Sequence, residues 1–337
     1  METVSRVLEY SSRVRKIEHR GWQVVPAVLD ALQHCAAVFP RLTHVVLISQ
    51  GCMVPPALAS SPYLQDISIS IGHSATMGSI VDKLERGDAA ALFLQHARTQ
   101  APCIHTLSIT GRINAKLGVA IASYTQLRSL SVQGLSFGID TFAAVAAFPF
   151  LETLDLSVFL LAEEIRACVE PPSATFPALR SLTMRMYGPI SEPILSLLPV
   201  GTLTKLRLEL IGREGGPGHM RIVFQTLAEK TSDSLGELQV MMDQEIMEET
   251  GNSRCCYDLE LIRPLAALKT LRRFTLYNSI LTDVDLPVIA EWWPALEHLV
   301  LDGDKSCLTP AAHSMIASLF PHLLSVHLPV APPSLNP

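Results

Sequence analysis

One short pattern recurs twelve times along this chain of 337 residues. Each copy has an apolar residue, two variable residues, a second apolar residue, one variable residue and a third apolar residue. Clear copies occupy residues 148–156 and 293–301. The first apolar position of each copy falls at Val14, Leu42, Leu64, Ile104, Leu127, Leu151, Leu179, Leu203, Leu235, Leu271, Leu296 and Leu323, so successive copies are 22 to 40 residues apart.

A unit of this length cannot bury its apolar residues alone, so it must stack on its neighbours. The pattern and its spacing predict an α/β leucine-rich-repeat solenoid, a horseshoe with parallel strands on the concave face and helices on the convex face. A solenoid grows in one dimension without a new core. We therefore predict one domain of about 12 repeats over residues 1–328, followed by a proline-rich disordered tail at 329–337.

Local patterns predict a strand and then a helix in each repeat. Residues 205–210 alternate between charged and apolar side chains, as in a strand with one buried face. Helical spacing predicts helices at 26–35, 139–148, 160–169, 220–229, 258–268 and 309–319, and a helix over 77–97 that is interrupted near Gly87-Asp88. An aromatic residue precedes proline at 39–40, 148–149, 176–177, 293–294 and 320–321, and we expect it to fill the corner between helix and strand.

Composition limits the classes of function. Hydrophobic residues make up 48% and charged residues 17%, which supports a continuous core and excludes general disorder. The net charge of -6 argues against nucleic-acid binding, which needs a positive surface. No targeting segment or membrane-spanning apolar run is present, and the seven cysteines form no disulfide framework. We expect an intracellular protein, cytoplasmic or nuclear, monomeric and not bound to membranes.

Few residues have the spacing of a chemical site. The glycine-rich stretch 212–218 follows a predicted strand but lacks a phosphate-binding motif, and an exposed loop explains it. The pair Cys255-Cys256 has neither metal-ligand nor redox spacing, and the eleven histidines form no metal motif. The acidic doublet Glu163-Glu164 suits the start of a helix. We predict no enzyme activity, no catalytic residue, no cofactor and no metal.

The concave face is the more informative surface. It should present the residues at the second, fourth and sixth places after each first apolar position. In the middle repeats these are mostly serine and threonine, whereas the later repeats carry basic and aromatic residues. We name these the basic patch, a candidate partner-binding site: Arg185, Lys205, Arg207, Arg273, Tyr277 and His298. Arginine and tyrosine are frequent anchors of interfaces, and guanidinium groups pair with carboxylates and phosphates, so an acidic or phosphorylated target segment fits. The alternative is a solvated sheet face with charges for solubility.

The segment Leu8-Glu9-Tyr10-Ser11-Ser12-Arg13-Val14-Arg15-Lys16-Ile17 and the repeated Phe-Pro-x-Leu-x-x-Leu-x-Leu strands resemble basidiomycete F-box-like leucine-rich-repeat proteins. The resemblance covers nearly the whole chain. It implies a substrate receptor of a ubiquitin ligase, whose F-box binds a Skp-type linker and cullin while the repeats hold the target. About forty residues beginning Leu-Pro-x-Glu/Asp form an F-box, and this sequence has none. We therefore expect linker and cullin as partners only if an F-box lies upstream.

The most specific interpretation is a protein-recognition module that forms the substrate-binding part of such a receptor. The alternative is an interaction scaffold without a link to a ligase. A third interpretation is an enzyme or small-ligand sensor that uses the loops at 212–218 and 243–256.

Overall fold

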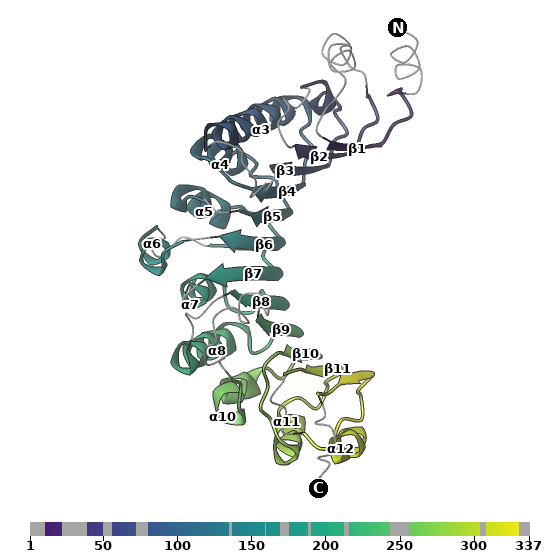
Figure 1. The fold of residues 1–337 in the computed structure, drawn as a ribbon, viewed down its shortest axis with the longest axis vertical. Helices are drawn as coiled ribbons and strands as arrows, with labels where there is room; N and C mark the ends of the chain where they lie inside the picture. The colour runs from purple at the N-terminus through teal and green to yellow at the C-terminus, as the bar shows by residue number, and fades with distance from the viewer. Residues whose placement is uncertain are drawn as a thin grey trace. The chain divides into compact units, whose positions relative to one another are not determined.

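The structure is a computed structural model, and it describes residues 11–21, 39–49, 56–71, 80–134, 137–158, 160–168, 175–187, 190–211, 216–242, 256–303 and 308–329. The chain divides into two compact units, residues 1–160 and 161–337. Each unit repeats one arrangement, a strand followed in most repeats by a helix (Figure 1). The prediction of one domain over 1–328 stays a prediction.

The first unit contains six described strands. Each strand pairs in parallel with the next one along the chain, so strand order follows sequence order. The elements are β1 (Lys16–Gly21), β2 (His44–Ser49), the 3-10 helix η1 (Pro56–Ala59), β3 (Asp66–Ile71), α3 (Ile80–Gln100), β4 (Thr106–Gly111), α4 (Ala115–Ala122), β5 (Ser129–Gln133), α5 (Ile139–Ala146) and β6 (Thr153–Val158).

The second unit repeats this organisation, again with parallel pairing between successive strands. Its elements are α6 (Ala162–Cys168), β7 (Ser181–Tyr187), α7 (Ser191–Ser196), β8 (Lys205–Ile211), α8 (Pro217–Thr231), β9 (Glu237–Met242), α10 (Leu259–Ile262), η2 (Arg263–Ala267), β10 (Arg273–Leu276), η3 (Asp283–Asp285), α11 (Leu286–Trp292), β11 (His298–Leu301), α12 (Ala311–Leu319) and β12 (Ser325–His327).

The repeat pattern places every strand. Each of the twelve strands begins two residues after a first apolar position, as Lys205 follows Leu203. In β3, β4, β5 and β11 buried apolar side chains alternate with partly exposed residues, and on β8 Leu206 and Leu208 are each 1% exposed. The last strand, β12, differs because all of its residues are exposed. The chain therefore folds as a leucine-rich-repeat solenoid with parallel strands, which confirms the predicted fold class.

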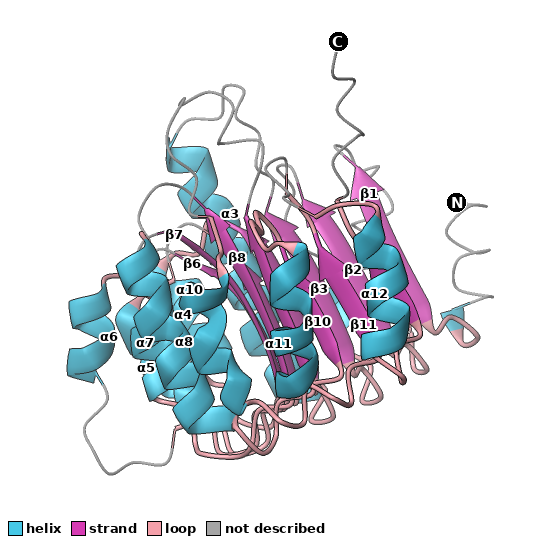
Figure 2. Cartoon of the chain, turned by 90° about the horizontal axis from the view of Figure 1, so that it is seen from below, coloured by secondary structure: helices cyan, strands magenta, loops and turns pink. Residues whose placement is uncertain are grey.

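Helices lie on one side of the strands in each unit (Figure 2). Most apolar strand residues are buried in the core. The predicted helices at 139–148, 160–169, 220–229, 258–268 and 309–319 correspond to α5, α6, α8, α10 with η2, and α12. The helix predicted at 26–35 lies outside the described residues. The opposite side of the strands, called the open strand face here, carries the residues at the second, fourth and sixth places of each repeat.

The aromatic residues before proline fill the corners as expected. Phe148, Phe176, Trp293 and Phe320 are at most 2% exposed, and Phe39 is 6% exposed. The indole Nε1 of Trp293 donates a hydrogen bond to the carbonyl of Leu265 at 3.1 Å, which satisfies its one polar group inside the core.

One helix prediction was wrong in detail. The structure shows α3 as a single helix that passes through Gly87 and Asp88 without interruption. A Cβ at Gly87 would lie 2.6 Å from Nδ2 of Asn114, the residue that caps α4. The glycine therefore serves close packing of α3 against the start of α4, and the Asp88 carboxylate accepts a hydrogen bond from that same amide at 2.8 Å.

Candidate protein-binding face

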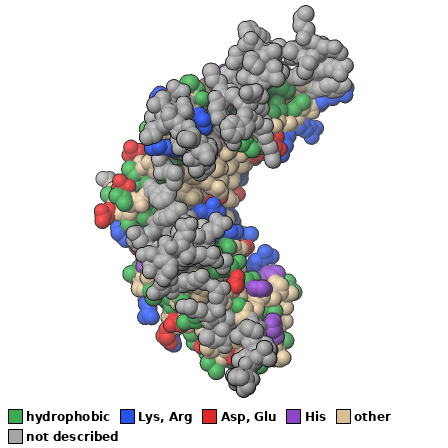
Figure 3. Space-filling view, in the orientation of Figure 1, with side chains coloured by type: hydrophobic (Ala, Val, Ile, Leu, Met, Phe, Trp, Pro, Cys, Tyr) green, Lys and Arg blue, Asp and Glu red, His purple; other side chains and the backbone are tan. Residues whose placement is uncertain are grey.

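All six residues of the basic patch lie in the second unit, on or directly after β7, β8, β10 and β11. Their side chains are partly or fully exposed. Figure 3 shows lysine and arginine side chains in blue, and histidines in purple, on the side where the strands of this unit lie. The structure thus brings the basic patch together on the open strand face of one unit.

Strand register fixes which of these residues are neighbours. Arg185 pairs in register with Glu209 on β8, and Lys205 pairs with Glu237 on β9. Glu237 in turn lies beside Arg273 on β10. Because neighbouring strands are roughly 4.8 Å apart, each of these side chains can reach the next strand.

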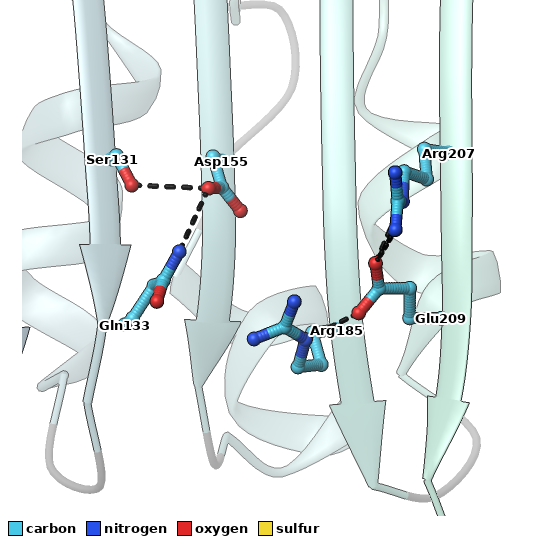
Figure 4. A network of polar contacts seen from close by, with 6 residues as sticks. All are labelled: Ser131, Gln133, Asp155, Arg185, Arg207 and Glu209. Atoms are coloured by element: carbon cyan, nitrogen blue, oxygen red, sulfur yellow. Dashed lines mark hydrogen bonds and ion pairs between the residues drawn. The ribbon is translucent and has the colours of Figure 1, made fainter. Parts of the chain in front are cut away.

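Two arginines of the basic patch share one carboxylate. The Nε group of Arg185 donates to Oε2 of Glu209, and the Nε group of Arg207 donates to Oε1 at 2.6 Å (Figure 4). The Glu209 side chain is only 14% exposed, whereas the two guanidinium groups are 39% and 42% exposed. Burial raises the pKa of Glu209, but the hydrogen bonds and positive charges of Arg185 and Arg207 outweigh burial, so the pKa is lowered from its ordinary value.

Lys205 is also paired. Its ammonium group lies 3.3 Å from Oε2 of Glu237, and the amide of Gln239 donates to the other oxygen of that carboxylate at 2.9 Å. The Glu237 side chain is 18% exposed. Three of the four cations predicted for partner binding therefore already face carboxylates of the same sheet.

Arg273 differs from the other cations of the basic patch. It is exposed, and within the described part of the chain it has no ion pair or side-chain hydrogen bond. The adjacent Arg272 is the residue that pairs with Glu297, at 2.5 Å. The Nδ1 atom of His298, next to Arg273 in register, lies 2.6 Å from the hydroxyl of Ser325.

Tyr277 extends β10 by one residue, because its backbone N–H bonds to the carbonyl of Val240 at 3.0 Å. Its side chain is partly exposed, and its hydroxyl has no hydrogen-bond partner among the residues that the structure describes. Thr275 lies between Arg273 and Tyr277 on the same face and is likewise without a side-chain partner there.

The open strand face of the first unit has a different chemistry. Serine and threonine dominate its β3 to β6 strands, as the sequence indicates. Asp155 on β6 accepts hydrogen bonds at one oxygen, from Ser131 at 3.0 Å and from Gln133 at 3.2 Å (Figure 4). The Asp155 carboxylate is thus hydrogen-bonded by neutral side chains, whereas the Glu209 carboxylate of the second unit is hydrogen-bonded by two charged guanidinium groups.

Sequence reasoning missed a second polar group in the first unit. The Nε2 atom of His44 lies 2.6 Å from Oδ2 of Asp66, and Nδ1 of His105 lies 3.9 Å from the other oxygen. His44 and Asp66 occupy the same place in successive repeats, so an alignment of the repeats would have brought them together. In the described ranges no group of three His, Cys, Asp or Glu side chains has the geometry to hold a metal ion.

The structure adds little to the other stretches that the sequence singled out as possible chemical sites. Of the glycine-rich stretch 212–218, residues 212–215 lie outside the described residues, and Gly216 precedes α8. Cys255 is outside them too, whereas Cys256 is described and partly exposed. Glu163 and Glu164 lie in the first turn of α6, where carboxylates favour the helix dipole as expected. No helix in the described ranges has the length and apolar character to cross a membrane.

No family model and no curated protein matches this sequence. Among solved structures, an internalin from Listeria monocytogenes is similar over 97% of this chain and 94% of its own, with 12% identity and a TM-score of 0.46. The leucine-rich-repeat-containing protein LegL7 from Legionella pneumophila is similar over 85% of this chain and 99% of its own, with 14% identity and a TM-score of 0.41. Identity this low bears on the fold alone.

Proposed function

We propose that this chain is a protein-recognition module whose open strand face in the second unit contacts a target protein. The observation that carries the proposal is the placement of exposed arginine, lysine, tyrosine and histidine side chains on neighbouring strands of one face. Arginine and tyrosine are enriched among interface anchors, and a regular sheet holds them in a fixed array. Small hydroxyl residues would suffice to solvate this face, as they do in the first unit.

The proposal predicts that targets contact the open strand face and not the helical side. A photo-crosslinking residue can replace Val300, which is partly exposed on the open strand face of β11 in register with Thr275, and separately Gln225, which is exposed on α8. Proteins crosslinked in cells through position 300 and not through position 225 support the proposal. Equal crosslinking from both positions, or crosslinking from 225 alone, would contradict it.

The finer proposal is that the module forms the substrate-binding part of an F-box-type ubiquitin-ligase receptor. Its support is the resemblance of residues 8–17 and of the repeated strands to basidiomycete F-box-like proteins. Affinity purification of the full gene product tests it: a Skp-type linker and a cullin should co-purify with the target. Purification of the target without linker or cullin would favour the ligase-independent scaffold.

A further inference from the structure

Most cations of the basic patch are already engaged in the free protein. Arg185 and Arg207 hold Glu209, and Lys205 faces Glu237. A target that recruited Arg207 would have to draw it away from a carboxylate that is 14% exposed. Removing one of the two partners from a mostly buried carboxylate is costly, because Glu209 is poorly solvated and would keep only Arg185.

Three side chains on the same face, on or directly after β10, form no hydrogen bond or ion pair with other described residues. Arg273, Thr275 and Tyr277 occupy alternate positions and have no side-chain partner among the described residues. All three can donate hydrogen bonds: Arg273 through a charged guanidinium group, the others through hydroxyl groups. We call these three residues the donor strip.

The spacing of the donor strip allows its three side chains to donate hydrogen bonds to one chemical group of a target. Residues two apart along a strand are roughly 7 Å apart, and the short Thr275 lies between the two long side chains. Arg273 and Tyr277 are therefore roughly 13 Å apart along the strand, a span that two long side chains on one face can bridge from its two ends. His298, beside Arg273 in register, has its Nδ1 atom against Ser325, which leaves Nε2 directed elsewhere.

Charge favours an anion at this place. The open strand face of β7 to β11 carries the four cations Arg185, Lys205, Arg207 and Arg273 and the three carboxylates Glu209, Glu237 and Asp302, so four positive and three negative charges leave a net charge of +1. Of these four cations, Arg273 is the one that pairs with no carboxylate in the described part of the chain. Guanidinium and hydroxyl donors together suit an oxyanion, which accepts several hydrogen bonds at once.

We propose that the donor strip is the docking site for an anionic oxygen group, a carboxylate or a phosphate, on an extended segment of the target protein. The inference rests on the proposed function and narrows it. The sequence alone does not distinguish the cations of the basic patch. In the structure Arg185 and Arg207 are partners of Glu209, and Arg273 is the cation that we propose binds the target.

The test uses three immobilised peptide libraries that differ only in a fixed central residue: phosphoserine, glutamate or glutamine. The purified full chain should bind the phosphoserine library, the glutamate library or both more strongly than the neutral glutamine library. R273Q should weaken that binding roughly tenfold or more, the effect of losing a charge-assisted hydrogen bond. Y277F should weaken it a few-fold. Preference for phosphoserine over glutamate identifies phosphate as the group, and equal binding identifies a general oxyanion.

R221Q is the matched control, because Arg221 is also exposed but lies on α8. It should bind as the wild type does. The proposal is overturned if all three libraries bind equally, or if R273Q binds the anionic libraries as tightly as R221Q does. Because Arg273 is exposed, R273Q should remain folded, and circular dichroism verifies this. If R273Q leaves crosslinking of targets through position 300 unchanged, the donor-strip proposal fails while the proposed function stands.

Discussion

Glu209 is the residue that organises the open strand face of the second unit. Its carboxylate accepts hydrogen bonds from one arginine on the neighbouring strand and from one on its own strand. Without it, the guanidinium groups of two diagonal neighbours, whose positions are roughly 8 Å apart on adjacent strands, would have no carboxylate between them. A carboxylate that looks like a moderating charge in the sequence is therefore a structural element of this face.

We predict that Glu209→Gln destabilises the protein by about 1–2 kcal/mol at neutral pH. The side chain keeps its shape but loses its charge, and the two arginines then repel each other. The loss is smaller than for a fully buried pair, because the guanidinium groups are 39% and 42% exposed. Urea unfolding followed by circular dichroism measures it, and a glutamine variant as stable as the wild type would contradict it.

The same pair of proteins should show a pH dependence. The folded-state pKa of Glu209 is lowered below its ordinary value of 4.5. A carboxylate with a depressed pKa contributes stability that is fully present above that ordinary value and is lost as the pH falls through the folded pKa. The stability difference between wild type and Glu209→Gln should therefore be constant near neutral pH and shrink below about pH 4.5. An unchanged difference at pH 3 would show that the charge of Glu209 is not its cause.

Gly111 ends β4 in a conformation that other residues rarely adopt. Its φ is +121°, and a Cβ there would lie 2.1 Å from the carbonyl oxygen of Ile71. We predict that Gly111→Ala lowers the free energy of unfolding by about 1–3 kcal/mol or more, because both the backbone and the neighbouring strand must shift. Gly218→Ala is the control: a Cβ at Gly218 meets nothing within 4 Å, and this residue lies within α8, where alanine is favoured over glycine, so the substitution should not lower stability. Equal unfolding midpoints for the two variants would contradict this account.

Among the elements, strands were easier to predict than helices. Period-2 alternation behind each first apolar residue placed all twelve strand starts, because burial of one strand face permits a single register. The break expected in α3 did not occur. Glycine disfavours a helix only by roughly 1 kcal/mol, and the packing of α3 against Asn114 is sufficient to offset it.

Contacts between repeats were the part that sequence reading missed. Arg185 and Glu209 occupy the same place in successive repeats, and so do His44 and Asp66, yet each pair is more than twenty residues apart in sequence. Reading each repeat alone shows a charge, whereas superposing the repeats shows its partner. The distinction between paired Arg207 and unpaired Arg273 depends on side-chain geometry, which no repeat alignment provides.

Asn114 links two helices of the first unit. Its side-chain oxygen accepts a hydrogen bond from the backbone N–H of Leu117 at 2.9 Å, and its amide donates to Asp88 on α3. We predict that Asn114→Ala costs about 1 kcal/mol through loss of the cap of α4. Thr125→Ala, an exposed substitution in the turn after α4, should have almost no effect. Chemical denaturation of both variants checks this, and similar losses would mean that the cap is not stabilising.

At the scale of the whole molecule, stability comes from stacking of the repeats. In a solenoid each repeat contacts only its neighbours, so a defect in one strand weakens the stack around it. The leucines of successive strands form continuous rows: Leu130 on β5 lies in register with Leu154 on β6, and both are 0% exposed. The open strand face contributes little to this core, so its residues are free to serve recognition.

Substitutions of two adjacent residues should therefore differ strongly in their effect on the free energy of unfolding. Leu154→Asp buries a carboxylate without a partner in the row of leucines, and we predict a loss of several kcal/mol. Thr153→Asp introduces the same side chain one residue earlier, on the open strand face, where position 153 is exposed. It should change stability by less than about 0.5 kcal/mol. Thermal and urea unfolding of the two variants measure the contrast. Comparable losses in both would mean that the two faces of β6 do not differ in burial, and the assignment of recognition to one face and stability to the other would fail with it.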